Sequence, residues 1–431
     1  MTATDDLATA VPAHVPAELV HDFDFYNMGD ETDVHRFYRS LHDRPDVPDI
    51  FWTPRNGGHW VVTRYADLVR VFEDRENFSS RQQLIPAPPE GLLGLVTLDG
   101  EEHSAFRKLV QPSLTTPFVE GNTEGERIDA YIARVCNDLI DDMLPRGGCE
   151  FFTEFSTKMP IEVVMKTLVD LPEEDLPRLM PLVDAVAHAG SDPEEFGAAF
   201  FGLAMYMASE VVPKRRANPG NDMLSAIVHG TVLGRPLTDE EIIATCNVMI
   251  IGGLDTVTSM LLYTVWHLAE HPEHRRRLRE EPALIPKAVE ELLRRYAILN
   301  VCRYVARDTD FNGIHFAEGD LVLVPSTAGA VDESQYPDAM TVDFDRANKK
   351  HVSFSRGAHS CVGSLLARRE MRIFIAEWLR RIPDFSVKPG TTVEMQAAIA
   401  NRIKELHLVW DVPETSAPAS VRSAPTTRIG A

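Results

Sequence analysis

The sequence has few cysteines and no paired cysteine motif. Five of its 431 residues are cysteine, namely Cys136, Cys149, Cys246, Cys302 and Cys361. No two of them form a C-x-x-C pair, which argues against zinc and iron–sulfur sites. The odd count and scattered spacing are typical of free thiols in a reducing compartment. For four of the five we expect small buried side chains.

Positive charge is scarce as well. There are 43 Lys and Arg against 65 Asp and Glu, a formal net charge of −22. This charge disfavours non-specific binding to nucleic acid or anionic lipid. The longest uncharged run, residues 196–209, is shorter than the roughly 20 residues of a membrane-spanning helix. Residues 1–20 lack a basic region followed by an apolar run, so no signal peptide is predicted. We expect a cytoplasmic protein that binds neither membrane nor nucleic acid.

The composition predicts one large domain. Residues 1–20 are rich in Ala, Pro and Thr, and residues 412–431 in Ser, Pro, Ala and Thr. We therefore expect a loose N-terminal segment and a disordered C-terminal tail. Residues 21–411 contain no linker long enough to mark a boundary, and no internal repeat, so they form a single domain.

Helical periodicity predominates in that domain. Residues 239–270 predict a long helix, since Thr238 can serve as N-cap and Glu241 can complete a capping box. At 1.5 Å per residue this helix would run roughly 45–50 Å. The remaining expectations are helices at 286–298 and 362–381, short strands within 304–324, and a hairpin at 49–63. The predicted fold class is mainly α with a minor β part (α+β).

Cys361 lies in a segment with several chemically suggestive neighbours, Phe354-Ser355-Arg356-Gly357-Ala358-His359-Ser360-Cys361-Val362-Gly363. A helix beginning at residue 362 would place the thiol just before a helix N-terminus. There the helix dipole and free N–H groups favour the thiolate, the form that binds metal ions. Gly357 permits a turn that a side chain would block. For a lone cysteine before a helix, a free thiol would be the better interpretation.

The pattern F-x-x-G-x-H-x-C-x-G is complete here and resembles the ligand loop of the cytochrome P450 family. The resemblance implies the cytochrome P450 fold, with a long central helix, a proximal cysteine-ligand loop and small β-sheets. It implies haem b as cofactor and Cys361 as its sulfur ligand. Phe354 would then shield the sulfur and Gly363 would let the helix approach the flat macrocycle. Arg356 and His359 would bring positive charge towards the haem carboxylates.

The segment Gly252-Gly253-Leu254-Asp255-Thr256 lies in the middle of the predicted long helix. Each glycine costs roughly 1 kcal/mol against alanine in a helix. Alone, a kinked core helix with a satisfied Asp255 would be the better interpretation. The segment is similar to the family's oxygen-activation motif, which implies catalytic roles for Thr256 and Asp255, including proton relay, and places Gly252 at the haem.

For several other charged residues, only the resemblance to the family predicts a role. Glu291 and Arg294 are three residues apart on one helix face, ordinarily a solvated pair. The resemblance instead implies a buried structural pair. It also implies propionate-binding roles for four residues that would singly read as surface charges: His103, Arg107, Arg303 and His359.

The resemblance extends roughly from residue 14 to residue 410, and is strongest to the bacterial camphor hydroxylase subfamily. The supporting segments are 22–24, 56–60, 171–175, 252–256, 366–370 and 381–385. This subfamily implies a monomer that uses O2 and two electrons from a [2Fe–2S] ferredoxin, itself reduced by an NADH-dependent flavoprotein reductase. The ferredoxin would dock near Arg107 and the cysteine loop.

The sequence departs from that subfamily at two places. Camphor hydroxylases carry a substrate-binding tyrosine in the loop before Asp99. The loop here has none, Gly91 stands at the matching position, and the potassium site of that loop is left open. Val301 occupies a position where the subfamily often has an aspartate near a propionate.

The substrate pocket implied by the resemblance is entirely apolar: Leu84, Leu93, Leu95, Val183, Val248, Ile251, Leu299 and Ala400. A site without a hydrogen-bond donor for the substrate discriminates weakly. We therefore expect hydroxylation of an unactivated C–H bond in an apolar terpenoid or norisoprenoid, ionone-like rather than camphor. Two alternatives stay open. One is a haem-thiolate peroxygenase, which has no obvious need for Asp255 and Thr256. The other is a non-catalytic haem sensor, which would usually carry an output domain.

Overall fold

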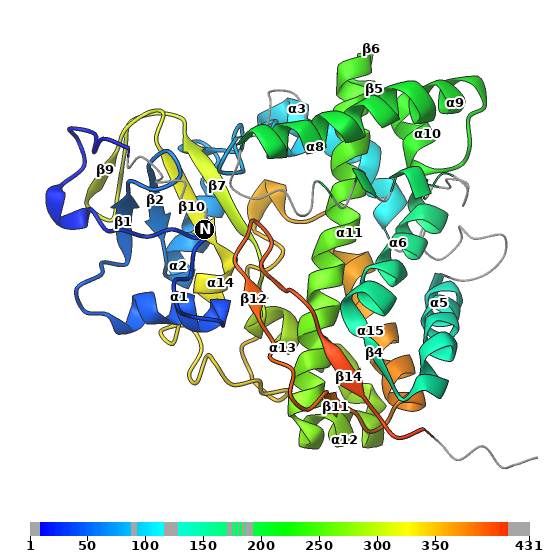
Figure 1. Ribbon diagram of the computed structural model, residues 1–431. Coiled ribbons are helices and arrows are strands. Elements are labelled where there is room, and N and C mark those ends of the chain that lie inside the picture. The colour runs from blue at the N-terminus through cyan, green and yellow to red at the C-terminus, as the bar shows by residue number, and fades with distance from the viewer. Residues whose placement is uncertain are drawn as a thin grey trace, which may run out of the picture.

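The computed structural model describes residues 9–87, 93–115, 128–169 and 193–412, with residues 175, 177–179, 181–182 and 185 between the last two ranges. Figure 1 shows a large helical part built around α11 (Asp239–Glu270), with a smaller part that contains the main sheet beside it. The N-terminal elements, in blue, lie in the smaller part. The cofactor cavity described below lies against α11.

Helices dominate the described residues, which confirms the predicted fold class. Besides α11 they are α1 (Val34–Asp43), α2 (Tyr65–Glu73), α3 (Gly100–Val110), α5 (Ile128–Met143), α6 (Lys158–Val164), α8 (Pro193–Tyr206), α9 (Val212–Ala217), α10 (Met223–Val228), α12 (Pro272–Glu280), α13 (Ile285–Arg295), α14 (Ser326–Ala330) and α15 (Ser364–Arg381).

The main sheet has five strands, in the order β1 (Ile50–Thr53), β2 (His59–Val62), β10 (Leu321–Pro325), β7 (Asn300–Val305) and β3 (Phe78–Ser79). β2 and β10 pair in parallel and the other neighbours are antiparallel. The β1–β2 hairpin confirms the prediction for residues 49–63. Both hairpin strands are buried along their whole length, which suits their aromatic and β-branched residues.

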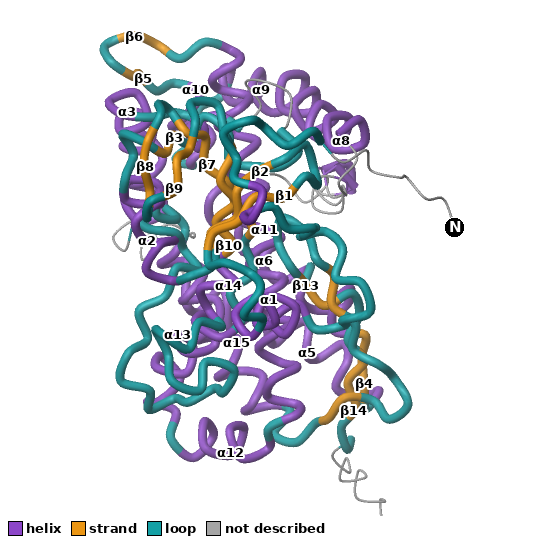
Figure 2. The backbone as a smooth tube through the Cα atoms, turned by 90° about the vertical axis from the view of Figure 1, so that its left-hand side faces the viewer, coloured by secondary structure: helices purple, strands orange, loops and turns teal. Residues whose placement is uncertain are grey.

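The smaller sheets are short, and the one that contains β4 and β14 lies apart from the main sheet, as Figure 2 shows. One has three strands, in the order β11 (Ser386–Val387), β14 (His407–Val409) and β4 (Gly148–Glu150). The two-stranded ones are β5 (Thr231–Val232) with β6 (Arg235–Pro236), β8 (Thr309–Phe311) with β9 (Ile314–Phe316), and β12 (Met395–Gln396) with β13 (Arg402–Ile403).

The central helix α11 begins where the sequence predicts. The Thr238 hydroxyl accepts the N–H of Glu241, and the Glu241 carboxylate accepts the N–H of Thr238, a complete capping box. Its 32 residues span about 48 Å at 1.5 Å per residue. Within the described part of the chain it alone is long and apolar enough to cross a membrane, but 65% of its most apolar window is buried inside the protein. It is a core helix, which explains an apolar surface on more than one side.

Three predicted boundaries differ from the structure. The last helix, α15, starts at Ser364 rather than at residue 362, because Gly363 is its N-cap. α13 ends at Arg295, and the next residues lead into β7. The expectation of a loose segment at 1–20 is wrong for residues 9–20. There Val20 pairs with Trp52 of β1, and Val15 is buried.

Candidate functional site

One cavity brings together residues from segments that are far apart in the sequence. It is lined by α11 and by the cysteine loop (residues 354–363), and α3 and β7 contribute to its polar wall. Its empty volume is about 1590 Å³, counted out to its open mouth. The predicted cofactor residues that line it are His103, Arg107, Gly252, Arg303, Phe354, His359, Cys361 and Gly363.

The backbone of the loop fixes the position of Cys361. The Cys361 N–H donates to the Phe354 carbonyl at 2.9 Å, and the Ser360 N–H donates to the Gly357 carbonyl at 3.2 Å. Gly357 has φ +69°, and a Cβ there would come within 2.9 Å of the Phe72 carbonyl oxygen, so only glycine fits this turn. The loop therefore presents one sulfur to the cavity in a defined place.

The thiol of Cys361 is accessible from the cavity but otherwise surrounded by protein. Burial raises its pKa, and the backbone N–H of Gly363, then the charges of Arg107 and Arg368, act in the opposite direction. These donors lie where a thiolate would develop its charge. The surroundings therefore suit a thiolate whose negative charge is balanced by a bound metal ion.

One face of the Phe354 ring makes a cation–π contact with an arginine. The Arg368 guanidinium of α15 lies 4.5 Å from the centre of the Phe354 ring. Arg368 is itself held by the Glu290 carboxylate of α13 at 2.6 Å. Because the ring is fixed from α15 and α13 together, Phe354 is held beside the sulfur.

The polar wall of the cavity carries excess positive charge. The imidazoles of His103 and His359 stack, with centroids 3.9 Å apart. Arg107 donates to the Ser360 carbonyl at 2.7 Å, which joins α3 to the cysteine loop. Burial, followed by the charges of His359 and Arg107, lowers the pKa of His103 to about 4. The structure thus brings all four predicted propionate partners to one cavity; Arg356 is not among its lining residues.

The burial of Arg303 indicates which kind of ligand the polar wall of the cavity would bind. Its guanidinium is almost fully buried and donates to the carbonyl of Cys302 at 2.8 Å. Burial lowers its pKa to about 10. His103 Nε2 is also buried without a hydrogen-bond partner among the described residues. A buried cation and a buried ring nitrogen without a partner are both stabilised by a ligand that carries negative charge and forms hydrogen bonds. A flat macrocycle with two carboxylates, facing a thiol at its centre, satisfies both requirements, so these residues fit haem.

Another part of the cavity wall is formed by α11. A Cβ on Gly252 would meet nothing within 4 Å, whereas one on Gly253 would come within 3.0 Å of Val164 Cγ2 on α6. Gly252 therefore keeps the cavity open and Gly253 allows close helix packing. The Thr256 hydroxyl lines the cavity and donates to the Gly252 carbonyl at 3.1 Å. Asp255 is partly buried and is not among the lining residues.

The predicted substrate residues divide into three groups. Leu95, Val248 and Leu299 line the cavity. Val183, like Gly91 of the loop without tyrosine, lies outside the described residues. The others are absent from the lining and pack into the main hydrophobic core: Leu84, Leu93, Ile251 and Ala400.

Helical spacing explains why Ile251, predicted to line the substrate pocket, does not line the cavity. It also explains why Met249, which was not predicted, does line it. Met249 lies seven residues before Thr256, hence on the same face of α11, and lines the cavity. Ile251 lies on a different face. Counting by three and four from Thr256 would have found Met249 and also Met260. Leu168 and Met223, from other segments, line the cavity without such a sequence signal.

Glu370 of α15 is another lining residue that the sequence did not predict. It lines the same cavity, is fully buried, and neither carboxylate oxygen has a hydrogen-bond partner within the described ranges. Burial raises its pKa well above the usual range of a glutamate. Burial therefore favours the neutral form of this carboxyl group.

The predicted pair Glu291–Arg294 is buried, as expected. Both side chains are 0% exposed, and Arg294 Nη2 lies 2.8 Å from Glu291 Oε1. Arg346 also contacts Glu291, at 3.0 Å. Arg294 further donates to the carbonyls of Ala330 and Ala339, at 3.0 and 2.8 Å. The pair ties α13 to the segment that leads to the cysteine loop and does not line the cavity.

Comparisons with known proteins agree with this site. A model of the cytochrome P450 family matches residues 206–398. The probable cytochrome P450 127A1 of Sinorhizobium fredii is 30% identical over 412 residues, 93% of this chain and 97% of that protein. The crystal structure of CYP101J2 superposes with a TM-score of 0.84 at 34% identity, covering 94% of this chain and 100% of that one. CYP101C1 gives 0.83 at 35% identity, covering 93% and 100%. The chain therefore belongs to the cytochrome P450 family of haem b monooxygenases and is similar to members of its camphor-hydroxylase-like subfamily.

Proposed function

We propose that this monooxygenase hydroxylates an unactivated C–H bond of an apolar terpenoid or norisoprenoid, with Cys361 as the thiolate ligand of the haem iron. The observation that carries the proposal is that Cys361 and Thr256 both line one largely apolar cavity. When bound there, a haem with a thiolate ligand supplies O2 activation and the insertion of one oxygen atom.

The residues of the chain have separate tasks in this proposal. His103, Arg107, Arg303 and His359 bind the two propionates and set the orientation of the macrocycle. Phe354 keeps water from the sulfur. The Thr256 hydroxyl can exchange its bond to the Gly252 carbonyl for a bond towards the cavity. Asp255 stands next to it on α11 and supplies protons from the outer side.

The apolar wall supports the proposed substrate class. The side chains of four lining residues offer no hydrogen bond to a ligand: Leu95, Val248, Met249 and Leu299. The loop before Asp99 contains no tyrosine. Such a wall binds by shape and buried area, so an ionone-like ring with its chain suits it better than a compact ketone.

A [2Fe–2S] ferredoxin, reduced by an NADH-dependent reductase, is the proposed electron donor to a monomeric, cytoplasmic enzyme. Arg107 reaches the backbone of the cysteine loop, and positive charge there on a chain of net charge −22 would favour an acidic partner. Membership of a family of monooxygenases argues against the alternative function of a non-catalytic haem sensor. The peroxygenase alternative is addressed by the Thr256 variant discussed below.

A substrate screen tests the substrate class. Purified holoenzyme is titrated with camphor and with α- and β-ionone, and the low- to high-spin absorbance change is recorded. We expect at least tenfold tighter binding of an ionone than of camphor. Tight camphor binding with no ionone response would contradict the proposed class. The ligand assignment is tested separately, because Cys361→Ser should abolish the thiolate-type absorbance of the reduced carbon monoxide complex.

A further inference from the structure

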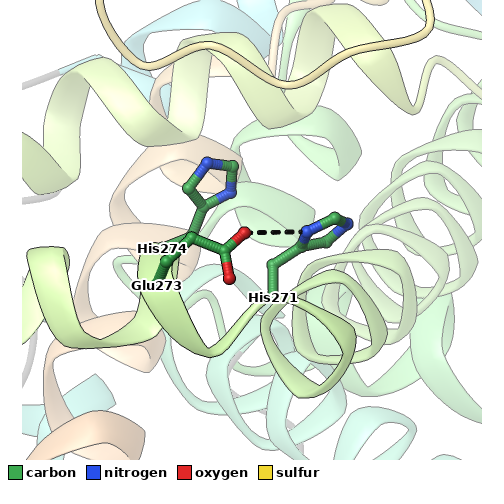
Figure 3. Close-up of side chains that lie close together, drawn as sticks. All are labelled: His271, Glu273 and His274. Atoms are coloured by element: carbon green, nitrogen blue, oxygen red, sulfur yellow. Dashed lines mark hydrogen bonds and ion pairs between the residues drawn. The ribbon is translucent and has the colours of Figure 1, made fainter.

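Three histidines and a glutamate gather where α11 ends and α12 begins. His267 is on the last turn of α11, His271 caps the helix, and Glu273 and His274 belong to the first turn of α12. The carboxylate of Glu273 lies between the rings of His271 and His274 (Figure 3). None of these residues lines the cavity of Cys361.

The potential ligand atoms lie close together. One atom each from His271, Glu273 and His274 lies within 4.8 Å of the other two. His271 Nδ1 is 3.1 Å from Glu273 Oε1. A further nitrogen is adjacent, since His267 Nε2 lies 2.8 Å from His274 Nδ1. Ligands about 2.0–2.1 Å from a tetrahedral ion lie roughly 3.3 Å apart, so small side-chain rotations bring these atoms to coordination distance.

We propose that His271, Glu273 and His274 bind a divalent transition-metal ion of the Zn²⁺ type, with His267 beside them as a further nitrogen donor. Imidazole and carboxylate are the ligands that Zn²⁺ combines in proteins, and hard ions such as Mg²⁺ prefer oxygen ligands. The partial exposure of His271 and Glu273 leaves a route for the ion and for a water ligand. The bound ion links the end of α11 to α12.

The surroundings hold the cluster ready for such an ion. His267 is buried, and its Nδ1 lies 2.9 Å from the Tyr296 hydroxyl, which fixes the ring beside His274. His267 also stacks on His271, with centroids 4.3 Å apart, and His274 packs against Phe344 at 4.7 Å. Partners that orient ligating imidazoles are typical of metal sites.

Equilibrium dialysis of tag-free holoenzyme against Zn²⁺ tests the site. Haem-loaded protein is required, because Cys361, His103 and His359 would otherwise offer a second place for the ion. We expect about one Zn²⁺ per chain in the wild type, and at least tenfold weaker binding in the His271→Gln/His274→Gln double variant. His315→Gln is the matched control, since His315 is 48% exposed and His271 45% exposed. Mg²⁺ at the same concentration should not compete.

A second variant guards against misfolding of the first. Glu273→Gln changes a side chain that is 55% exposed, so it should leave the fold intact and still weaken Zn²⁺ binding severalfold. Stoichiometric Zn²⁺ binding should also raise the thermal unfolding temperature of the wild type and not that of the double variant. The proposal is overturned if the wild type binds no more Zn²⁺ than the double variant, or if His315→Gln weakens binding as much as the double variant does.

Discussion

The imidazole rings of His103 and His359 stack at 27° with their centroids 3.9 Å apart, although one belongs to α3 and the other to the cysteine loop. His359 Nε2 also lies 3.5 Å from Asp99 Oδ1, just before α3. Hydrogen bonds from His359 and Ser79 outweigh burial and lower the pKa of Asp99 to about 2. The carboxylate thus holds His359 in place, while the unpaired Nε2 of His103 stays available for a ligand.

Replacing Arg303 should weaken haem binding. In Arg303→Leu a propionate would lose its buried cation, and breaking such a pair costs about 3–5 kcal/mol. We expect the rate of haem transfer to excess apomyoglobin to rise at least tenfold. Arg307→Leu is the control, because Arg307 is 57% exposed and pairs with Glu76 on the surface. Equal haem loss in both variants would remove Arg303 from the propionate assignment.

The Thr256 hydroxyl should determine how electrons are used. In a monooxygenase, Thr256→Ala should divert reducing equivalents to hydrogen peroxide and lower product per NADH at least about tenfold, because a positioned proton donor contributes 10²–10⁴-fold. Peroxide release and product are measured together with the reconstituted redox partners. A peroxygenase driven by added peroxide would barely respond.

Thr258→Ala is the control for that experiment. Thr258 lies on the same helix, but its hydroxyl donates to the Ser156 carbonyl at 2.9 Å and it does not line the cavity. If both alanine variants waste electrons equally, the effect comes from a disturbed α11 and not from the hydroxyl at the cavity.

The sequence predicts the elements with strong local signals and misses contacts that arise only from packing. The capping box at Thr238 gives the start of α11, and the spacing around Cys361 gives the cysteine loop. Glu291 and Arg294 look like a surface pair until the fold buries them. Neither Leu168 nor Met223 can be placed at the cavity from local pattern, because tertiary packing brings their segments together. Nor can a local pattern show that the Glu370 carboxyl group finds no hydrogen-bond partner among the residues that the structure describes.

Removing Glu291 should be costly. Glu291→Ala leaves Arg294 as a buried cation with only carbonyl partners, which costs about 3–5 kcal/mol of unfolding free energy. Urea unfolding of the holoenzyme measures this loss. Asp46→Ala breaks an ion pair with Arg44 whose side chains are 63% and 56% exposed, and should cost less than about 1 kcal/mol. Similar losses in both variants would contradict a structural role for the buried pair.

Replacing Glu370 should stabilise the protein at high pH. Because burial raises the folded-state pKa of Glu370, the folded state holds a proton that the unfolded state releases above pH of about 4.3. Folding stability therefore falls as pH rises above that value, and continues to fall up to the folded-state pKa. Glu370→Gln keeps the shape and removes the titration. We expect its unfolding free energy to exceed that of the wild type at pH 8, with the advantage shrinking towards pH 4.

Glu377 on the same helix supplies a control, because its replacement should change stability with pH in the opposite direction. There hydrogen bonds from Arg380 and Asn137 outweigh burial and lower the pKa of Glu377. Its ionised form stabilises the fold above the unfolded-state pKa, so Glu377→Gln should lose stability at pH 8 and recover it as pH falls. If Glu370→Gln also lost stability at pH 8, the native Glu370 carboxylate would have to be ionised. It would then need a cation or a chain of water molecules reaching it through the haem cavity.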